Sequence, residues 1–323
     1  MSEVVVGVDG GGTKTNVAVV GTDGAVLARV QGGTSNYQVI GGEKLAQVLR
    51  ETIQNALETA GVDASQVRHL VVALAGVGRP SDREAVTKIV EGLGLSKRST
   101  VDSDAAAALA GAFAGGEGII VISGTGTICF GKGADGRVER SGGWGYLLGD
   151  EGSGYWIGQQ ALIAALKDLD GRGPRTALRE ALEKHLGVER IDRVIPRVYQ
   201  GDLDRAGVAA LAPLVFEVAA AGDPVAKEIV KRAGEELGKL AAAVAKRLNW
   251  SSARVRVAPI GSVFKRRAVL EPEMTRVLKD AGVDHEIVDP LLDPALGAAV
   301  IGLQREGVAV EGKVLANLVG NVS

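Results

Sequence analysis

The sequence predicts an α/β protein built from two related halves, each a mixed β-sheet flanked by helices. The first observation is a repeat: an apolar strand, a Gly/Thr turn and a second strand run over 4–20, and 119–130 repeat that plan. The second is the order of elements, because a strand meander followed by strands that alternate with helices is typical of a sheet with helices on its faces. The third is size, since 323 residues suffice for two domains of ordinary length.

The first half reads as a three-stranded meander followed by alternating helices and strands. Its long helix shows apolar residues at the helical period and ends at Gly61, the usual residue after a helix C-terminus. Its second helix is expected to begin at Ser81, because Ser81 and Glu84 have the spacing of a capping box. The expected elements are strands at 4–8, 16–20 and 25–30, a helix over 42–60, a strand at 69–74, a helix over 81–93, a strand at 100–102 and a helix over 104–113.

The pattern restarts at Gly118 and repeats with one large addition. A block over 152–247 has helical periodicity, several Gly/Pro breaks and no strand-like alternation. Pro272 is expected in the first turn of a later helix, where its missing N–H does no harm. The expected elements are strands at 118–123, 127–132 and 137–140, the helical block, a strand at 253–259, a helix over 271–281, a strand at 286–288 and a helix over 294–303.

Two domains follow from this order. The first is expected at 1–117 and the second at 118–307, divided at the glycine-rich segment Gly115–Gly118, with 152–247 as a helical insertion in the second. The alternative that 308–323 rejoin the first domain is left open.

Composition narrows the class of function. A net charge of −2 gives no general attraction for nucleic acid or for an anionic membrane. The single cysteine, Cys129, excludes an intrachain disulfide and is expected in the core. His69, His185 and His285 lack metal-ligand spacing and are expected to be structural. No apolar run reaches the roughly 20 residues of a membrane span and no signal segment is apparent, so a cytoplasmic location is expected.

The two glycine-rich turns are candidate phosphate-binding loops. Consecutive glycines in Asp9–Thr15 let the backbone take positive φ and turn N–H groups toward one point, while Thr13 and Thr15 add hydroxyls and Lys14 adds charge. A plain hairpin turn needs only one or two glycines. The spacing is not that of a Walker loop, and a strand follows rather than a helix. Because Ser123–Thr127 repeats the feature, phosphate binding is favoured.

Two aspartates are candidates for chemistry. Asp9 ends a buried strand, where a carboxylate needs a partner, and Mg²⁺ beside phosphates is favoured over a turn-capping role. Asp104 opens an Ala-rich helix, so an N-cap and a general base are equally supported by its chemistry. Asp102 competes for either role.

Two glycine-rich stretches surround two of the three tryptophans. Ser141–Gly145 and Gly149–Trp156 combine small residues, which let backbone approach a ligand, with carboxylates that accept hydroxyl hydrogen bonds, a combination that suits a polyol. Trp144 and Asp150 are interpreted as functional. Trp156 is expected in the core.

Two further turns are ambiguous from the residues alone. Thr34–Asn36 ends the meander and has the composition of an ordinary turn. Gly261 and Ser262 follow a strand end, where adenine or ribose could lie, although a plain connection is equally possible.

In this order along the chain, these segments resemble the N-acetylglucosamine kinases of the BadF/BadG/BcrA/BcrD ATPase group, within the actin/hexokinase/Hsp70 superfamily. The resemblance covers essentially the whole chain, and its most specific block is Gly142–Gly145 through Gly149–Ser153. It implies two ribonuclease-H-like, actin-like ATPase domains with an interdomain active-site cleft for ATP and a hexose. The segments that carry it are Asp9–Thr15, Ser35–Asn36, Ser103–Ala105, Ser123–Thr127, Gly142–Gly145, Gly149–Trp156 and Gly261–Val263.

The resemblance also implies residue roles. Asp104 would be the base at the sugar 6-hydroxyl, which raises it above a simple N-cap. The sugar would contact Asn36, Asp104, Trp144, Gly145 and Asp150. Together with the turn glycines, the expected nucleotide-binding set is Gly11, Gly12, Thr13, Lys14, Gly124, Thr125, Gly126, Gly261 and Ser262. Mg²⁺ would lie at Asp9.

The expected function is therefore phosphorylation of the 6-hydroxyl of N-acetylglucosamine or a related amino-hexose by ATP and Mg²⁺, and a homodimer is expected from the family. Glucosamine, N-acetylmuramate or a broader range of hexoses are alternative substrates. An ATPase activator or regulator of the BadF type is the alternative from another class. That branch of the family uses cysteines from two subunits to bridge a cluster, and Cys129 alone makes it unfavourable.

Overall fold

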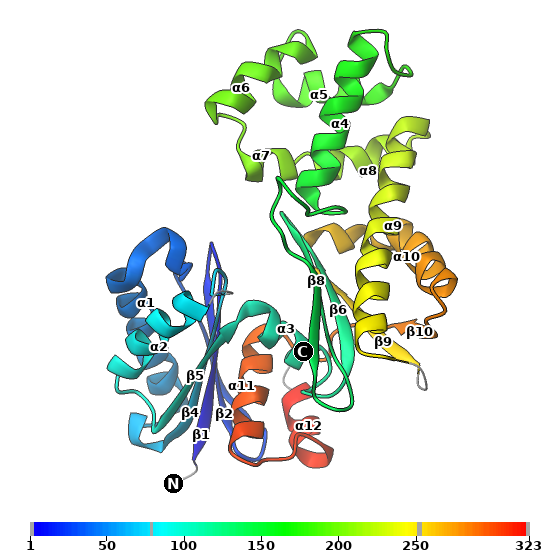
Figure 1. Cartoon of the computed structure of the whole chain (residues 1–323). Helices are drawn as coiled ribbons and strands as arrows, with labels where there is room; N and C mark the ends of the chain where they lie inside the picture. Colours follow the sequence, from blue (N-terminus) through cyan, green and yellow to red (C-terminus); the bar gives the residue numbers. More distant parts are fainter. Residues whose placement is uncertain (1–2, 78–79, 251–253, 321–323) are drawn as a thin grey trace. The chain divides into compact units, whose positions relative to one another are not determined.

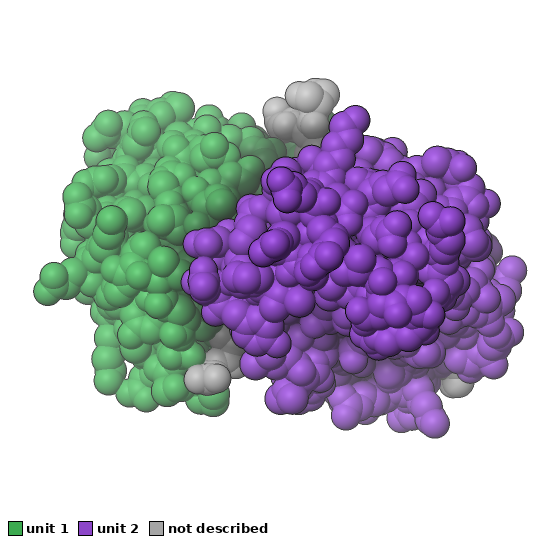
Figure 2. All heavy atoms as spheres, turned by 90° about the horizontal axis from the view of Figure 1, so that it is seen from above, with its two compact units in different colours: residues 1–117, 289–323 green, residues 118–288 purple. Residues whose placement is uncertain are grey.

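The computed structural model describes residues 3–77, 80–250 and 254–320, which form two compact units. Unit 1 combines Met1–Glu117 with Asp289–Ser323, and unit 2 is Gly118–Val288, as coloured in Figure 2. Each unit contains one five-stranded mixed sheet with helices packed on it, so the predicted fold class is confirmed.

The sheet of unit 1 has the strand order β3-β2-β1-β4-β5 (Figure 1). The first three strands form the expected antiparallel meander, and β4 and β5 continue the sheet parallel to β1. In register, Gly10 lies opposite Leu74, and Leu74 lies opposite Ser103, so three carboxyl ends lie at one edge. The strands are β1 (Val4–Gly10), β2 (Thr15–Gly21), β3 (Val26–Gly32), β4 (Val67–Leu74) and β5 (Arg98–Ser103).

Helices cover both faces of this sheet because β1 is apolar on both sides. Its even-numbered valines share one cluster with α1 and α2, while Val5 lies with Leu296 and Ala299 of α11 in another. A Cβ on Gly7 would lie 2.2 Å from the Ala295 carbonyl oxygen, so only glycine lets α11 approach β1 this closely. The helices are α1 (Tyr37–Ala60), α2 (Pro80–Gly92), α3 (Asp104–Ala112), α11 (Pro294–Arg305) and α12 (Gly312–Val319).

The chain returns to unit 1 earlier than the sequence indicated. The expected second domain extended to 307, whereas contacts assign Asp289 onward to unit 1. The physical reason is α11, which completes the core between β1 and α3. Its Ala/Gly-rich pattern identifies a closely packed helix and carries no information about which sheet it packs on.

The sheet of unit 2 repeats the plan with the order β10-β9-β6-β7-β8. Again an antiparallel meander, β6-β7-β8, is extended by parallel strands, β9 and β10. This agreement in topology supports the duplication inferred from the repeated turns. The strands are β6 (Gly118–Ser123), β7 (Thr127–Lys132), β8 (Val138–Gly142), β9 (Val255–Ile260) and β10 (His285–Ile287).

The block over 152–247 is helical throughout, as predicted, and its last helix α9 packs on β6, β7 and β8 (Figure 1). A Cβ on Gly234 would lie 2.7 Å from the Leu270 carbonyl, which explains how closely α9 and α10 approach each other. The helices of the block are α4 (Gly154–Leu169), α5 (Ala177–Leu186), α6 (Val194–Gln200), α7 (Arg205–Ala209), α8 (Ala212–Ala220) and α9 (Pro224–Arg247), with the short 3-10 turn η2 (Ile191–Arg193). Unit 2 also contains α10 (Arg267–Asp280) and the 3-10 turn η3 (Ser262–Arg266), and unit 1 contains the 3-10 turn η1 (Ala64–Gln66).

Three helix starts differ from the prediction. Ser81 is not an N-cap, because α2 is already helical at Pro80. Pro272 lies in the second turn of α10, because η3 leads directly into a helix that begins at Arg267. The first long helix begins at Tyr37 and crosses a non-helical residue, Gly41 (φ 73°), which interrupts the periodic pattern.

Candidate functional site

Three carboxylates of unit 1 gather at the carboxyl edge of its sheet. Asp9 is the penultimate residue of β1, Asp104 follows β5 directly, and Asp293 precedes α11. The negative charges of Asp104 and Asp293 both act on Asp9. Asp293 also forms an ion pair with Arg29 of β3. Asp293 was not predicted as a site residue, because its sequence context is that of an ordinary helix N-cap.

Asp9 is held in an environment that disfavours its negative charge. Burial raises the pKa of Asp9, a hydrogen bond from Asn16 Nδ2 to Asp9 Oδ2 (3.2 Å) opposes that rise, and Asp104 adds to it. Asn16 is itself oriented by Gln31, whose Nε2 donates to Asn16 Oδ1 at 3.0 Å. A cation would relieve this unfavourable charge.

The residues present fit one Mg²⁺ only if phosphate oxygens and water supply most of its ligands. Within the described residues, no group of three or more His, Cys, Asp or Glu side chains is arranged to hold a metal. Mg²⁺ beside a nucleotide needs only one or two carboxylates, because phosphate oxygens and water complete its octahedron. Asp9 meets that requirement directly or through a water.

Asp104 is the first residue of α3 and is not its N-cap. Ser103 takes that role, since its Oγ accepts a hydrogen bond from the Ala106 N–H at 3.2 Å. Asp104 Oδ1 accepts from the Ala105 N–H at 2.8 Å. Burial raises the pKa of Asp104, although its side chain retains solvent exposure, and the backbone hydrogen bond opposes the rise. Asp102 is ion-paired to Arg83, so Asp104 is the better candidate base.

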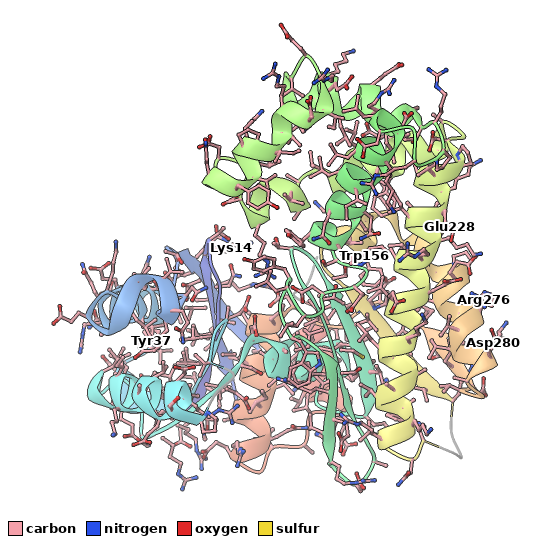
Figure 3. All side chains as sticks on the ribbon, turned by 45° about the horizontal axis from the view of Figure 1, so that its top comes forward. Lys14, Tyr37, Trp156, Glu228, Arg276 and Asp280 are labelled. Atoms are coloured by element: carbon pink, nitrogen blue, oxygen red, sulfur yellow. The ribbon has the colours of Figure 1, made fainter. Side chains whose placement is uncertain are left out.

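The first glycine turn is closed by one backbone hydrogen bond, from the Gly11 N–H to the Lys14 carbonyl at 2.9 Å. Gly12, Thr13 and Lys14 are exposed at the tip of the β1–β2 hairpin, where Figure 3 labels Lys14. The glycines do not have positive φ, contrary to the prediction. Gly10 is required because a Cβ would lie 2.1 Å from Ser35 Oγ, whereas a Cβ on Gly12 would meet open space.

Thr15 is structural, which corrects its expected role as a phosphate donor. Its buried hydroxyl donates to the Gly33 carbonyl (2.6 Å) and is hydrogen-bonded to Ser35 Oγ (2.7 Å). This pair fixes the turn before α1. Asn36 is the N-cap of α1 and accepts from the Gln38 N–H at 3.1 Å through Oδ1, which leaves its amide NH₂ for another partner.

The second glycine turn belongs to unit 2 and is built into the start of α4. The Gly124 N–H donates to the Gly126 carbonyl (3.0 Å), and the Gly124 carbonyl accepts from the Gly154 N–H (2.8 Å). Ser123 Oγ donates to the Gly152 carbonyl at 2.9 Å. Thr125 remains exposed at the tip of this turn.

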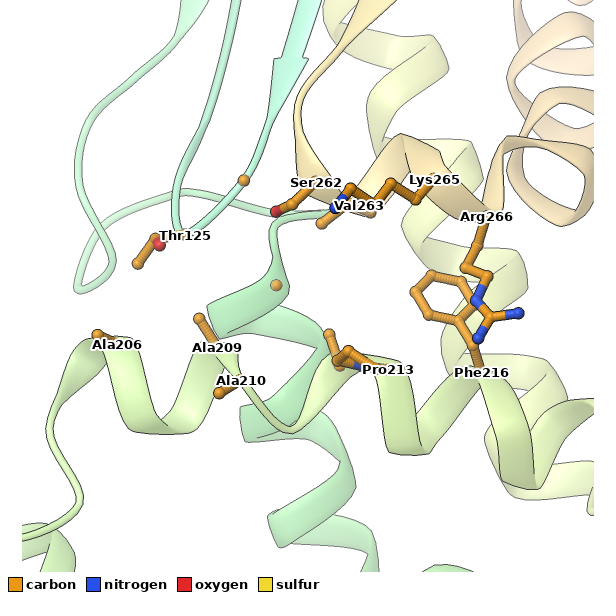
Figure 4. Close-up of a pocket in the computed structure, with 13 residues that line it drawn as sticks. Thr125, Ala206, Ala209, Ala210, Pro213, Phe216, Ser262, Val263, Lys265 and Arg266 are labelled. Carbon is orange, nitrogen blue, oxygen red and sulfur yellow. The ribbon is translucent and has the colours of Figure 1, made fainter. Parts of the chain in front are cut away.

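A cavity of about 460 Å³ lies beside the second turn, within the size range of small-molecule pockets (Figure 4). Gly124 and Thr125 meet Ser262 there, as predicted for neighbours of one ligand. Gly261 has φ 112°, and a Cβ would lie 2.3 Å from the Ser123 carbonyl, so it fixes the turn rather than the ligand. No sequence motif predicted the opposite wall, which the helical insertion supplies. Its residues are Ala206, Ala209, Ala210, Ala212, Pro213 and Phe216.

The tryptophan-containing loop after β8 is largely exposed. Trp144 is 66% exposed, and the guanidinium of Arg140 lies 4.7 Å from its ring centroid. Gly145 has φ 85°, and a Cβ there would meet nothing within 4 Å. Asp150 is buried, with Thr127 N–H donating to Oδ1 (3.1 Å) and Arg205 Nη2 donating to Oδ2 (2.9 Å). Trp156 is buried as expected.

The remaining candidate residues have structural surroundings. His69 contacts Glu306 and Thr100, and His285 Nδ1 lies 2.9 Å from the Val283 carbonyl oxygen. Cys129 is buried, and that burial raises the pKa of its thiol. No helix in the described part of the chain combines the length and apolar character that a membrane crossing requires.

Comparisons with known proteins agree over nearly the whole chain. The model of the BadF/BadG/BcrA/BcrD ATPase family matches residues 6–302. An N-acetylmuramic acid/N-acetylglucosamine kinase from Clostridium acetobutylicum is 35% identical over 297 residues, covering 92% of this chain and 97% of the relative. An N-acetyl-D-glucosamine kinase from Dictyostelium discoideum is 33% identical over 316 residues, covering 94% and 99%.

A solved structure is similar to this chain in both fold and sequence. The crystal structure of a candidate N-acetylglucosamine kinase from Chromobacterium violaceum superposes with a TM-score of 0.72 at 31% sequence identity, covering 94% of this chain and 99% of that one. The likeness thus extends over both units and the helical insertion.

Proposed function

The chain belongs to the BadF/BadG/BcrA/BcrD ATPase family, and we propose that it is an ATP-dependent kinase that phosphorylates the 6-hydroxyl of N-acetylglucosamine or a closely related amino-hexose. The observation that carries the proposal is the full-length similarity to two curated relatives, both named as N-acetylglucosamine kinases. The duplicated turns and the carboxylates beside them supply chemistry that such a reaction needs.

Unit 1 supplies the acid–base half of the reaction. Asp104 Oδ1 is oriented by the Ala105 N–H, so the other oxygen is available to accept the proton of the sugar hydroxyl. The raised pKa of Asp104 brings its basicity closer to that of a useful base near neutral pH. Asp9 would hold Mg²⁺, directly or through a water, and the ion would neutralise phosphate charge. Phosphoryl transfer depends mainly on such placement and neutralisation.

Unit 2 supplies the nucleoside half. The exposed Thr125 and the backbone of Gly126 would contact phosphate, as Thr13 would in unit 1, whereas the Gly124 N–H is already used within the turn. The adjacent cavity has small aliphatic side chains and Phe216 on one wall, which suits a flat apolar base, and Lys265 and Arg266 among its other lining residues, which suit an anion. Ser262 lies on its wall, where it can donate to the ribose or to the base.

The sugar contacts remain a proposal carried by the family resemblance. Asn36 donates its amide NH₂ to no group in the described part of the chain, and Trp144 has an exposed ring; both features suit a sugar. Asp150 reaches the sugar only through lone pairs that Thr127 and Arg205 leave unused. N-acetylmuramate is the alternative substrate that the name of one relative supports. Glucosamine and other hexoses are less favoured alternatives. Homodimer formation and a cytoplasmic location stay predictions.

The activator alternative is disfavoured by chemistry. A bridging cluster needs accessible thiolates, whereas the one cysteine of the chain, Cys129, lies on β7 with no exposed surface. Its raised thiol pKa makes ligation less favourable still.

A substrate panel tests the proposal. Purified protein is incubated with Mg-ATP and each of N-acetylglucosamine, N-acetylmuramate, glucosamine and glucose, and ADP release is followed with a coupled assay. We expect ADP release that depends on sugar and is fastest with N-acetylglucosamine. We also expect ³¹P NMR to identify the product as the sugar 6-phosphate. ADP release at the same rate without sugar would instead support the ATPase activator.

A further inference from the structure

We infer that Arg205 is a positioning residue that couples sugar binding to nucleotide binding through Asp150, an inference that rests on the proposed function. Arg205 opens α7 in the helical insertion, and its Nη2 donates to Asp150 Oδ2 at 2.9 Å. The other oxygen of the same carboxylate accepts the Thr127 N–H at 3.1 Å, at the end of the second glycine turn. One carboxylate therefore joins the insertion to the phosphate turn.

Asp150 is held there against two local costs. Its side chain is only 3% exposed, and a buried carboxylate is unfavourable unless it is paired and hydrogen-bonded. Its backbone has φ 61°, a left-handed conformation that non-glycine residues adopt only when their surroundings determine it. Because Arg205 is the cation paired with this carboxylate, removing it would release a strained residue.

Gly126 marks the same contact independently. Its φ is not positive, so the backbone alone does not call for glycine. A Cβ on Gly126 would lie 2.6 Å from Arg205 Nη2 and 2.9 Å from Asp150 Oδ2. The glycine in this turn thus makes room for the guanidinium. Replacing it with alanine is therefore a second way to displace Arg205 while every charge is kept.

Arg205 also contacts the loop that carries the expected sugar residues. Its guanidinium carbon lies 5.5 Å from the Tyr146 ring centroid, within cation–π range. Tyr146 follows Trp144 and Gly145 directly, and its ring meets Tyr155 of α4 edge-on at 5.0 Å. A single side chain therefore contacts both the sugar loop and the residue that orients the phosphate turn.

The coupling follows from the capacity of one carboxylate. An ionised carboxylate has about four lone-pair positions, and Thr127 and Arg205 use two of them. A sugar hydroxyl that donates to Asp150 would therefore bind to the same carboxylate that already holds the phosphate turn through the Thr127 N–H. Among the described residues, the buried Thr127 Oγ1 has no hydrogen-bond partner, so it is the Thr127 N–H, and not the hydroxyl, that ties the turn to Asp150. Sugar and nucleotide affinities must then depend on each other equally.

The test measures that dependence by calorimetry on the full chain. Binding of Mg²⁺ with a non-hydrolysable ATP analogue is titrated with and without saturating N-acetylglucosamine. Wild type is expected to bind the analogue about 5-fold or more tightly with sugar, the lower end of typical coupling. Arg205→Ala and Gly126→Ala should each reduce the ratio to less than about 2-fold. Arg232→Ala is the matched control, because Arg232 stacks on Trp156 at 5.2 Å elsewhere in unit 2 and should leave the ratio unchanged.

Each outcome decides between the two claims. If Arg205→Ala and Gly126→Ala melt like wild type and keep its coupling ratio, the inference is overturned and the kinase assignment stands. If both lose the ratio while Arg232→Ala keeps it, the positioning role is supported. A wild type whose ADP release ignores sugar would overturn the proposed function, and this inference with it.

Discussion

Replacing Asp104 with asparagine removes the candidate base while keeping its shape. The side-chain oxygen that accepts the Ala105 N–H at 2.8 Å is retained, and Ser103 still caps α3. The variant should therefore fold and bind sugar normally. Loss of a general base costs about 10²- to 10⁴-fold in turnover. At 1.36 kcal/mol per tenfold, that is about 2.7 to 5.4 kcal/mol of barrier.

The change in stability should be far smaller than the change in barrier. An acidic residue in the first turn of a helix contributes about 0.3 to 1 kcal/mol through the helix dipole. Against this, burial raises the pKa of Asp104, so its charge at neutral pH disfavours the folded state. The same charge also repels Asp9. These effects oppose each other, so Asp104→Asn should melt close to wild type.

The pH profile gives a second readout of the same variant. A base acts when deprotonated, so wild-type turnover should fall as pH drops through the pKa of Asp104. Since burial raises that pKa, the acid limb should lie above the range of an ordinary exposed aspartate. Asp104→Asn should lose this limb.

Turnover is measured by coupled ADP release and sugar affinity by calorimetry, with Asp102→Asn as the matched control. Asp102 is the neighbouring carboxylate, but it is ion-paired to Arg83 and should not act as the base. Turnover of Asp104→Asn within about threefold of wild type, with unchanged sugar binding, would refute the assignment of the base.

Three further perturbations follow from the structure. Glu306→Gln should lower the free energy of unfolding by about 1 to 3 kcal/mol, because Glu306 is a buried acceptor for charged donors. The hydrogen bond with His69 is the largest cause that lowers the pKa of Glu306. The stability that Glu306 contributes is therefore present above the usual glutamate pKa and is lost as the pH falls through the lowered pKa. Urea titrations of both proteins from pH 7 to 3 check the loss of stability and its pH dependence. Asp9→Asn should raise the Mg²⁺ concentration for half-maximal activity about 10- to 100-fold, measured with ATP held constant, and an unchanged Mg²⁺ dependence would contradict the anchor role. Gly10→Ala should destabilise the fold by about 1 to 3 kcal/mol through overpacking, whereas Gly12→Ala should melt normally and raise the KM for ATP; equal melting of the two would contradict the packing argument.

The fold was predictable because its signals are local. Apolar periodicity predicts the strands and most of the helices, and the glycine turn occurs twice in the chain. The return of α11 to unit 1 was not predictable, because it depends on Gly7 meeting Ala295 across 288 positions of sequence numbering. The start of α10 was predicted wrongly because η3, which leads into the helix at Arg267, has no distinctive residue pattern.

The candidate site shows the same division. Asp9, Asp104 and Thr125 stand beside strand ends, so sequence and topology together bring each to the carboxyl edge of its sheet. Arg205 and Phe216 come from the insertion, where ordinary helical residues give no sign of what they face. The role of Thr15 could not be predicted, because the sequence of a glycine turn is the same whether its hydroxyl bonds to phosphate or to the Gly33 carbonyl.

The duplicated turns have diverged in charge, and that difference gives the proposed reaction a direction. The first strand carries Asp9 next to its last residue, where burial and the charges of Asp104 and Asp293 disfavour a negative charge. The corresponding strand end in unit 2 carries Ser123, a neutral side chain that donates to the Gly152 carbonyl. Of the two turns, that of unit 1 is therefore the one expected to hold a metal ion, whereas the turn of unit 2 borders the cavity lined by Phe216, Ser262 and Arg266. In the proposed reaction, Asp9 and Asp104 of unit 1 would therefore serve the metal ion and the acceptor hydroxyl, and the cavity of unit 2 would serve the base.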